Sequence, residues 1–152
     1  MTNRTFAYLG ILLTACSAAT DPPPQSGIAS ELQCENGAMM TFADLHAQVI
    51  GPACTGCHHG GAGGTAPDMS TAEKGLASTR GVASIGYAKT LKIVDPGAPH
   101  TSTMMLKVLG GDLKGFAGPN GETVGGGMPQ VGTLSTAQKT AIRDWICSGA
   151  QP

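Results

Sequence analysis

The chain has 152 residues, in which 9 lysines and arginines nearly balance 10 aspartates and glutamates. A net charge of −1 excludes the strongly basic surface of a nucleic-acid-binding protein and gives no sign of electrostatic steering toward a partner. Large rings are scarce, with 3 Phe, 2 Tyr and 1 Trp against 23 Gly. Because a small domain with so little bulk is hard to stabilise alone, the composition favours a core completed by a bound cofactor.

Residues 1–15 have the pattern of an export signal, with Arg4 before an apolar stretch that is too short to span a bilayer. The sequence Leu-Thr-Ala-Cys at 13–16 resembles the bacterial lipobox, in which the signal is cut before a cysteine that is then lipidated. We therefore expect a lipoprotein anchored through Cys16, with an ordinary signal and a chance cysteine as the alternative. The resemblance implies a periplasm-facing protein of the bacterial cell envelope, in the outer rather than the inner membrane because Ser17 follows the cysteine.

Residues 16–33 contain a run of prolines among serines and alanines, without apolar periodicity. Such a composition cannot bury a core, so this stretch is expected to form a partly stiff tether. The remaining residues, 34–152, are enough for one domain and not for two.

The first helix of this domain is expected over residues 42–50. Thr41 and Asp44 form a helix start signal, and the turn former Gly-Pro at 51–52 is expected to end the helix. Apolar residues fall on one face at helical spacing: Phe42, Leu45 and Val49.

The residues that follow, Cys54-Thr55-Gly56-Cys57-His58, form the most informative motif in the chain. This Cys-x-x-Cys-His spacing is typical of c-type haem attachment, because two thiols can each add to a haem vinyl group and the adjacent imidazole can bind the iron. Zinc is less favoured, since a closed site needs a second ligand pair that the other cysteines do not provide. A redox or structural disulfide would leave His58 unexplained. We therefore expect Cys54 and Cys57 to form haem thioethers and His58 to bind the iron.

A second helix is expected over residues 71–78, after a glycine-rich turn at 59–64. Ser70 and Glu73 have the spacing of a capping box at its start. Leu76 is the main apolar residue of this helix.

A third helix is expected over residues 103–109, after a turn rich in proline and glycine at 95–99. Thr101 or Ser102 is expected to cap it, and residues 91–94 form a short extended stretch before the turn. Three of its residues are expected to face inward: Met105, Leu106 and Leu109.

The fourth helix, over residues 136–148, has the clearest amphipathic pattern. Ser135 and Gln138 form a capping box, and Gly149 is a good terminator. Lys139 and Arg143 are expected to lie on a solvated face. The apolar face is expected to contain Ile142, Trp145 and Ile146.

Two cysteines, Cys34 and Cys147, remain near the ends of the folded part. In an oxidising envelope compartment such a pair is expected to form a disulfide, with two buried free thiols as the alternative. Closing so long a loop contributes about 4–5 kcal/mol in the chain-entropy model.

Several further segments, taken in order with the Cys-x-x-Cys-His motif, resemble a bacterial mono-haem cytochrome c domain of the planctomycete-type or cytochrome c-like group. The resemblance implies an all-α, cytochrome c-like fold of about four short helices around one covalent haem c, with glycine-rich loops. The long loop at 110–127 and the Cys34–Cys147 pair depart from the family pattern. The similar segments are Pro-Asp-Met-Ser-Thr-Ala at 67–72, Gly-Val-Ala-Ser at 81–84, Val-Asp-Pro-Gly-Ala-Pro at 94–99, Gly-Gly-Met-Pro at 126–129 and 134–150.

The family pattern places its distal methionine at a Met-Pro, which here is Met128. Flexible glycines before it and Pro129 after it suit a loop that presents a thioether to the iron. The sequence also allows a different distal ligand, or an iron whose distal position is vacant. His59 is expected to face solvent. The weaker candidates for the distal ligand are Met104, Met105, His100 and His46, of which His46 is expected mainly to pack at the helix boundary.

Two secondary roles are also expected. His58 should donate its second ring N–H to a backbone carbonyl, by analogy one near Pro67. A haem propionate could be neutralised by a basic side chain, although an ordinary surface charge is the simpler reading of each candidate. The basic candidates are Arg80, Lys89 and Lys92.

These features predict a monomeric electron carrier, not an enzyme, that is held at the membrane by lipid and meets its redox partner proteins in transient encounters. A haem enzyme or gas-binding module with an open iron position is the first alternative. A haem-free envelope module stapled by a disulfide is the second. The sequence does not decide whether the protein is a subunit of a larger redox enzyme complex.

Overall fold

The computed structural model describes residues 30–35, 39–60, 67–85, 89–109 and 125–152. Within these ranges the chain forms helices and irregular connections, and its only β pairing consists of isolated bridges. This content agrees with the expected all-α class. The expected signal sequence at 1–15, Cys16 and most of the expected tether at 16–33 lie outside the described residues. So do most of the glycine-rich turn at 59–64 and most of the long loop at 110–127.

The first helical segment is longer than expected. It runs without a break through α1 (Phe42–Leu45), the π-helical turn η2 (His46–Ile50) and α2 (Gly51–Cys54). The Thr41 side chain caps it as expected, by accepting the Asp44 N–H at 3.1 Å.

The expectation that Gly51-Pro52 ends this helix is wrong. Proline lacks an N–H and its ring clashes with the carbonyl four residues earlier, which normally breaks an α-helix. Here the turn before it widens, and the Gly51 N–H donates to the carbonyl of His46, five residues back. The wider turn lets the helix continue past Pro52 to Cys54.

Helix α3 (Ala72–Thr79) begins one residue later than expected, with Thr71 as its cap. The Thr71 hydroxyl accepts the Lys74 N–H at 3.3 Å, so the expected capping box of Ser70 and Glu73 is wrong. Ser70 is engaged elsewhere, because its N–H donates to Asp68. A local sequence pattern cannot show this competition between two adjacent hydroxyl residues.

The packing of α3 against α1 depends on Gly75. This glycine is buried, and a Cβ placed on it would lie 2.9 Å from Cε1 of Phe42. The missing side chain therefore allows the two helices to approach closely.

The short 3-10 turn η3 (Pro99–Thr101) leads into α4 (Thr103–Val108). Ser102 occupies the cap position of α4, but its hydroxyl accepts the Asp95 N–H at 2.8 Å and donates to the carbonyl of Ala98 at 2.9 Å. It therefore ties the preceding turn together instead of capping the helix. Among the described residues, the expected extended stretch at 91–94 forms the isolated bridges Arg80–Val94, Ala83–Lys92 and Lys92–Ser102 and is not part of a longer strand.

Helix α5 (Thr136–Cys147) confirms the most detailed local prediction. Ser135 and Gln138 form the reciprocal capping box. At the other end Gly149 adopts a φ of 91°, and the Gly149 and Ala150 N–H groups return to the carbonyls of Ile146 and Trp145. This is a Schellman termination, which glycine at this position favours.

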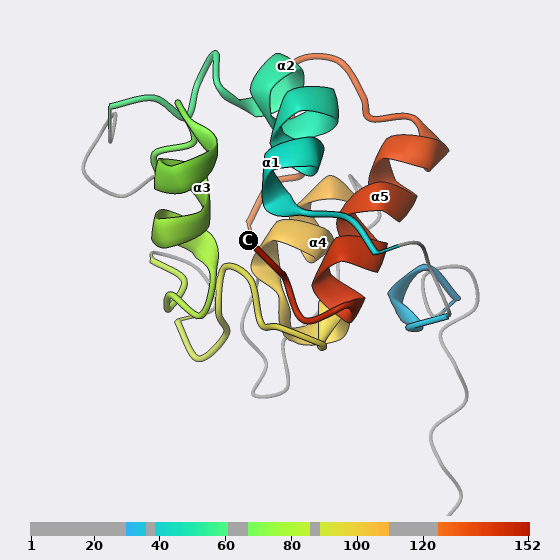
Figure 1. Cartoon of the computed structure of the whole chain (residues 1–152). Helices are drawn as coiled ribbons and strands as arrows, with labels where there is room; N and C mark the ends of the chain where they lie inside the picture. Colours follow the sequence, from blue (N-terminus) through green and yellow to red (C-terminus); the bar gives the residue numbers. More distant parts are fainter. Residues whose placement is uncertain (1–29, 36–38, 61–66, 86–88, 110–124) are drawn as a thin grey trace, which may run out of the picture.

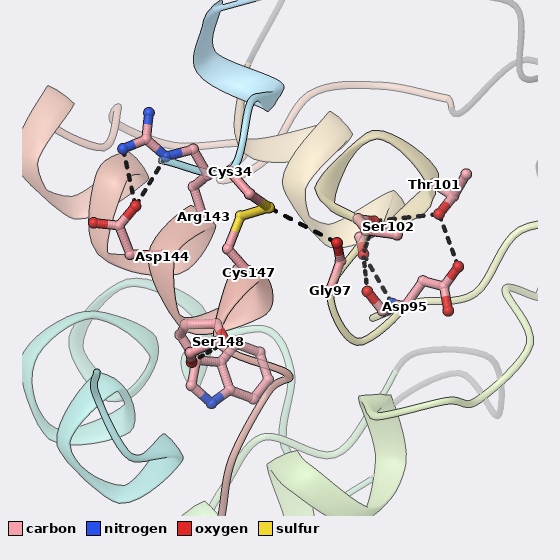
Figure 2. The surroundings of a disulfide bond; sticks show 11 residues. Cys34, Asp95, Gly97, Thr101, Ser102, Arg143, Asp144, Cys147 and Ser148 are labelled. Carbon is pink, nitrogen blue, oxygen red and sulfur yellow. Dashed lines mark hydrogen bonds and ion pairs between the residues drawn. A yellow bond between two sulfur atoms is a disulfide. The ribbon is translucent and has the colours of Figure 1, made fainter. Parts of the chain in front are cut away.

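The expectation of a solvated Arg143 is wrong. Its side chain is only 14% exposed and pairs with Asp144 at 2.9 Å (Figure 2). The turn η1 (Ser30–Leu32) contacts α5, and Glu31 lies beside Arg143 in one surface hollow. The N-terminal segment therefore covers a helix face that the sequence marks as polar.

The hydrophobic core lies where α1, α4 and α5 meet (Figure 1). The rings of Phe42 and Trp145 are 4.9 Å apart, and both residues also donate to the carbonyl of Gln151, Phe42 through its backbone N–H and Trp145 through its indole. The expected inward faces of α4 and α5 are confirmed, and Leu109, which follows the last residue of α4, is half-buried and packs against the core. The fully buried large side chains include Leu45, Ile50, Met105, Leu106, Ile142 and Ile146.

A disulfide joins the two ends of the described domain (Figure 2). The sulfurs of Cys34 and Cys147 are 2.03 Å apart, across 113 residues of sequence. Within the described ranges, no helix has the length and apolar character needed to cross a bilayer.

Candidate functional site

The Cys-x-x-Cys-His motif lies on a tight turn at the end of the first helical segment. The N–H groups of Cys57 and His58 both donate to the carbonyl of Cys54, at 3.2 and 2.9 Å. This turn brings both thiols and the imidazole to the same end of the helix. Both cysteines are free thiols, with Cys54 half-buried and Cys57 exposed.

A largely apolar cavity opens beside this turn. Its volume, including the open mouth, is about 950 Å³. Cys54 and His58 line it from the end of the first helical segment, Met104 and Lys107 from α4, and Met128 from the irregular segment before α5. The other lining residues are mostly apolar and include Ile50, Met69, Ile93 and Val108.

A second hollow continues from this cavity toward Cys57. It is lined by Cys57, Pro129 and Gln130, and it shares Cys54, His58 and Met128 with the first. The two thiols, the imidazole and the Met128 segment therefore line two adjoining hollows. Of the candidate distal ligands, Met128 and Met104 line these hollows, whereas Met105, His46 and His100 do not.

The expected hydrogen bond from the His58 ring to a backbone carbonyl is absent among the described residues. Nδ1 of His58 is buried and has no hydrogen-bond partner there, although Pro67 lines the same cavity. An unsatisfied buried polar atom costs about 1–3 kcal/mol. Among the described residues, therefore, an imidazole nitrogen beside the cavity has no hydrogen-bond partner.

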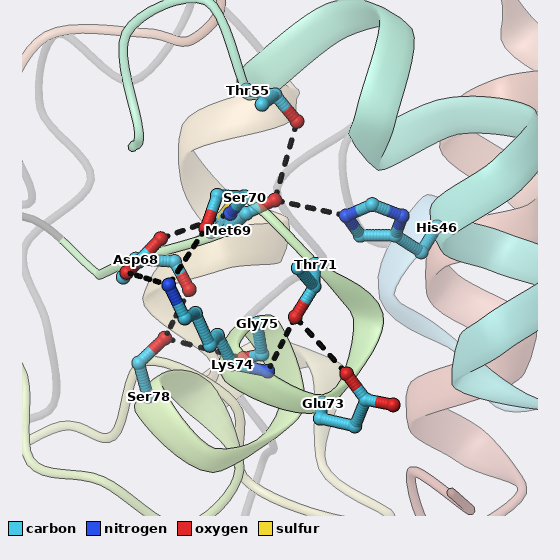
Figure 3. A network of polar contacts seen from close by, with 10 residues as sticks. All are labelled: His46, Thr55, Asp68, Met69, Ser70, Thr71, Glu73, Lys74, Gly75 and Ser78. Atoms are coloured by element: carbon cyan, nitrogen blue, oxygen red, sulfur yellow. Dashed lines mark hydrogen bonds and ion pairs between the residues drawn. The ribbon is translucent and has the colours of Figure 1, made fainter. Parts of the chain in front are cut away.

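The backbone of His58 is fixed through Met69 instead. The Met69 N–H donates to the His58 carbonyl at 2.8 Å. The Met69 carbonyl in turn accepts from Nε2 of His46 at 2.9 Å and from the Thr55 hydroxyl at 3.2 Å (Figure 3). A carbonyl can only accept, so Nε2 of His46 carries the proton. His46 is half-buried, in line with the expected boundary position.

His59 lies outside the cavity, as expected. It is exposed, and its Nδ1 donates to the carbonyl of Thr55 at 2.9 Å. This bond closes the turn around the motif from the solvent side.

Burial raises the pKa of the Cys54 thiol, and the neighbouring Cys57 raises it further. Beside the Met69 segment, the hydroxyl and N–H of Ser70 lower the pKa of Asp68 to about 2. A charged Asp68 also attracts Lys74, 3.5 Å away (Figure 3).

One lysine that lines the cavity was not predicted from the sequence. Arg80 donates to the carbonyl of Gly149 and Lys92 pairs with Asp95 at 2.7 Å, and neither residue lines the cavity. Lys107 does line it, and burial lowers its pKa. Its position three residues after Met104, which places both residues on one face of α4, could have identified Lys107 from the sequence.

In the part of the chain that the structure describes, no group of three or more His, Cys, Asp and Glu side chains is placed to hold a bare metal ion. The site is therefore defined by thiols, one imidazole and thioethers around an apolar space. No protein-family model, no curated protein and no solved structure matches the chain.

Proposed function

We propose that this chain is a mono-haem c-type cytochrome that carries single electrons in the bacterial cell envelope. The observation that carries the proposal is the convergence of His58 and Met128 on one cavity, together with Cys54. These ligand candidates lie 70 positions apart in the sequence, 58 to 128, and the motif predicts nothing about where the second one lies in space.

The residues around the cavity fit a haem in three respects. Two free thiols line this cavity and the adjoining hollow, a buried ring nitrogen of His58 has no hydrogen-bond partner among the described residues, and the cavity lining is mostly apolar. Cys54 and Cys57 would form the thioethers, and His58 and Met128 would be the axial ligands. When bound, haem supplies the one-electron chemistry, and the protein supplies ligation, burial and orientation.

The chain's own residues would set the behaviour of the site. A thioether from Met128 is a soft ligand that raises the reduction potential relative to two histidines. The apolar lining disfavours extra charge at the centre. No catalytic role is proposed for any residue.

The finer expectations belong to the same proposal. The helical fold would be cytochrome c-like, the chain monomeric and its redox encounters transient. Lipid at Cys16 would anchor it, facing the periplasm and in the outer membrane. In an envelope protein the tether would hold the domain off the membrane surface.

A second candidate function is a haem module that binds a gas or peroxide at an open iron position. The position of Met128 on a non-helical, half-buried segment favours it, since such a segment moves aside more easily than a helix does. Ready carbon monoxide binding to the ferrous wild type would support this candidate over the electron carrier.

The decisive test is expression in a strain that has cytochrome c maturation machinery. Mass spectrometry of the purified wild type should show one haem added covalently, and a pyridine haemochrome spectrum should identify haem c. The double variant Cys54→Ala, Cys57→Ala should lose the covalent haem, because no thiol remains to form a thioether. A wild-type chain without added haem mass would refute the proposal and leave the disulfide-stapled, haem-free module.

A further inference from the structure

We propose that Lys107 is a positioning residue that holds the Met128 segment against the cavity. The functional importance of this role rests on the proposed function, in which Met128 is the distal haem ligand. The contacts themselves are properties of the polypeptide and can be tested without haem.

The first contact comes from the backbone of α4. Lys107 lies in the last turn of this helix, where its carbonyl faces the N–H of the capping residue Leu109. The Met128 N–H donates to the Lys107 carbonyl at 2.8 Å. The helix end thus fixes the backbone of Met128 at the residue whose side chain lines the cavity.

The second contact comes from the Lys107 side chain. Its ammonium donates to the carbonyl of Gly126 at 3.3 Å. One residue therefore holds the segment at two points, Gly126 and Met128, two positions apart. Lys107 is half-buried and lines the cavity, and its charged donor makes this bond stronger than one between neutral groups, although the bond itself lies in an exposed position.

The segment has little other support among the described residues. Gly126 is exposed, and a Cβ added there would meet no atom within 4 Å. Met128 itself belongs to no helix. Loss of the ammonium should therefore free the 126–128 segment while the backbone bond and α4 remain.

The chain offers a matched control in Lys139. This lysine, on α5, lines a hollow together with Met128 and Pro129, but no hydrogen bond from its ammonium to the segment is found in the described structure. Lys107→Met keeps an unbranched apolar stem and removes the ammonium. Lys139→Met makes the same chemical change beside the same loop, and Lys107→Arg restores a donor.

Two measurements on the full chain, expressed with maturation machinery, test the proposal. The first is amide hydrogen exchange of residues 125–130, read by mass spectrometry. We expect exchange to be about tenfold faster in Lys107→Met, which corresponds to about 1.4 kcal/mol, and to return toward wild type in Lys107→Arg. Lys139→Met should match wild type.

The second measurement is titration of the ferric protein with imidazole, which competes with Met128 for iron. Lys107→Met should bind imidazole about tenfold more tightly than Lys139→Met, because the native ligand is held less firmly. Equal exchange and equal imidazole affinity in these two variants would overturn the role of Lys107. A wild type without haem would refute the proposed cytochrome, while the exchange comparison would still decide whether Lys107 holds the segment.

Discussion

The two sides of the cavity are built in different ways. On the His58 side, the motif follows directly from a helix, and Met69 fixes it through bonds to His58, His46 and Thr55. On the Met128 side, a non-helical segment depends on Lys107 for both of its described hydrogen bonds to α4. The first side is local in sequence and redundantly held, whereas the second is assembled across the fold.

This difference has a physical consequence for the proposed cytochrome. Several short bonds converging on one backbone unit keep the His58 side in place when one of them is lost. Among the described residues, the Met128 side has fewer hydrogen bonds over which a disturbance is distributed. Ligand exchange, if it occurs, should therefore take place at Met128 and leave His58 bound.

The largest expected effect is on the Met128 side. Met128→Ala should let ferrous protein bind carbon monoxide readily and should lower the reduction potential, because the soft thioether is lost. Visible spectra and a redox titration measure both changes. Met104→Leu is the matched control, since Met104 lines the same cavity from α4, and it should keep the wild-type spectrum. If only the Met104→Leu spectrum changed, Met104 and not Met128 would be the distal ligand.

The next effect concerns stability and not the site. Replacing Cys34 and Cys147 by serine should lower the free energy of unfolding by about 4–5 kcal/mol in the chain-entropy model, because the bond closes a long loop. Urea unfolding of the oxidised wild type and the variant measures the loss. The haem spectrum should not change, since neither cysteine lines the cavity. A loss below about 1 kcal/mol would show that the unfolded chain is already compact.

A smaller effect is expected when one bond on the His58 side is removed. His46→Phe should cost about 1 kcal/mol, because the Met69 carbonyl keeps the Thr55 hydroxyl as a partner. Urea unfolding gives the cost, and imidazole titration should match wild type. Tighter imidazole binding in His46→Phe would contradict the independence of the two sides.

The smallest effect is on acid stability. The pKa of Asp68 in the folded protein is about 2, below its value of about 3.9 in an unfolded chain. Its contribution is therefore complete above about pH 4 and disappears as the pH falls toward about 2. Urea midpoints measured across this range should fall less steeply in Asp68→Asn than in wild type. Equal slopes would mean that Asp68 contributes nothing to the acid response.

Several local features could be predicted because neighbouring residues decide them. The Thr41 cap, the Ser135–Gln138 box and the glycine that ends α5 each depend on a few adjacent positions. The predictions failed where two residues compete for one role, as Ser70 and Thr71 do at the start of α3.

Other predictions failed because the deciding neighbour is distant in sequence. Arg143 has the pattern of a surface residue, but the N-terminal segment covers it. The Pro52 position has the pattern of a helix end, but a π-helical turn absorbs the proline. Lys107 was not predicted to belong to the site, because its hydrogen-bond partners lie about twenty positions away in an irregular segment.

The sequence by itself determined the Cys54–His58 turn, the helical class and the ends of α5, since these depend on short-range spacing and capping chemistry. Only the tertiary structure decided that Met128 and Met104 share the cavity while Met105 does not, and that Lys107 holds the Met128 segment. The physical reason is that side chains separated by tens of residues meet only through the packing of α4 and α5 around one core, which no local pattern specifies.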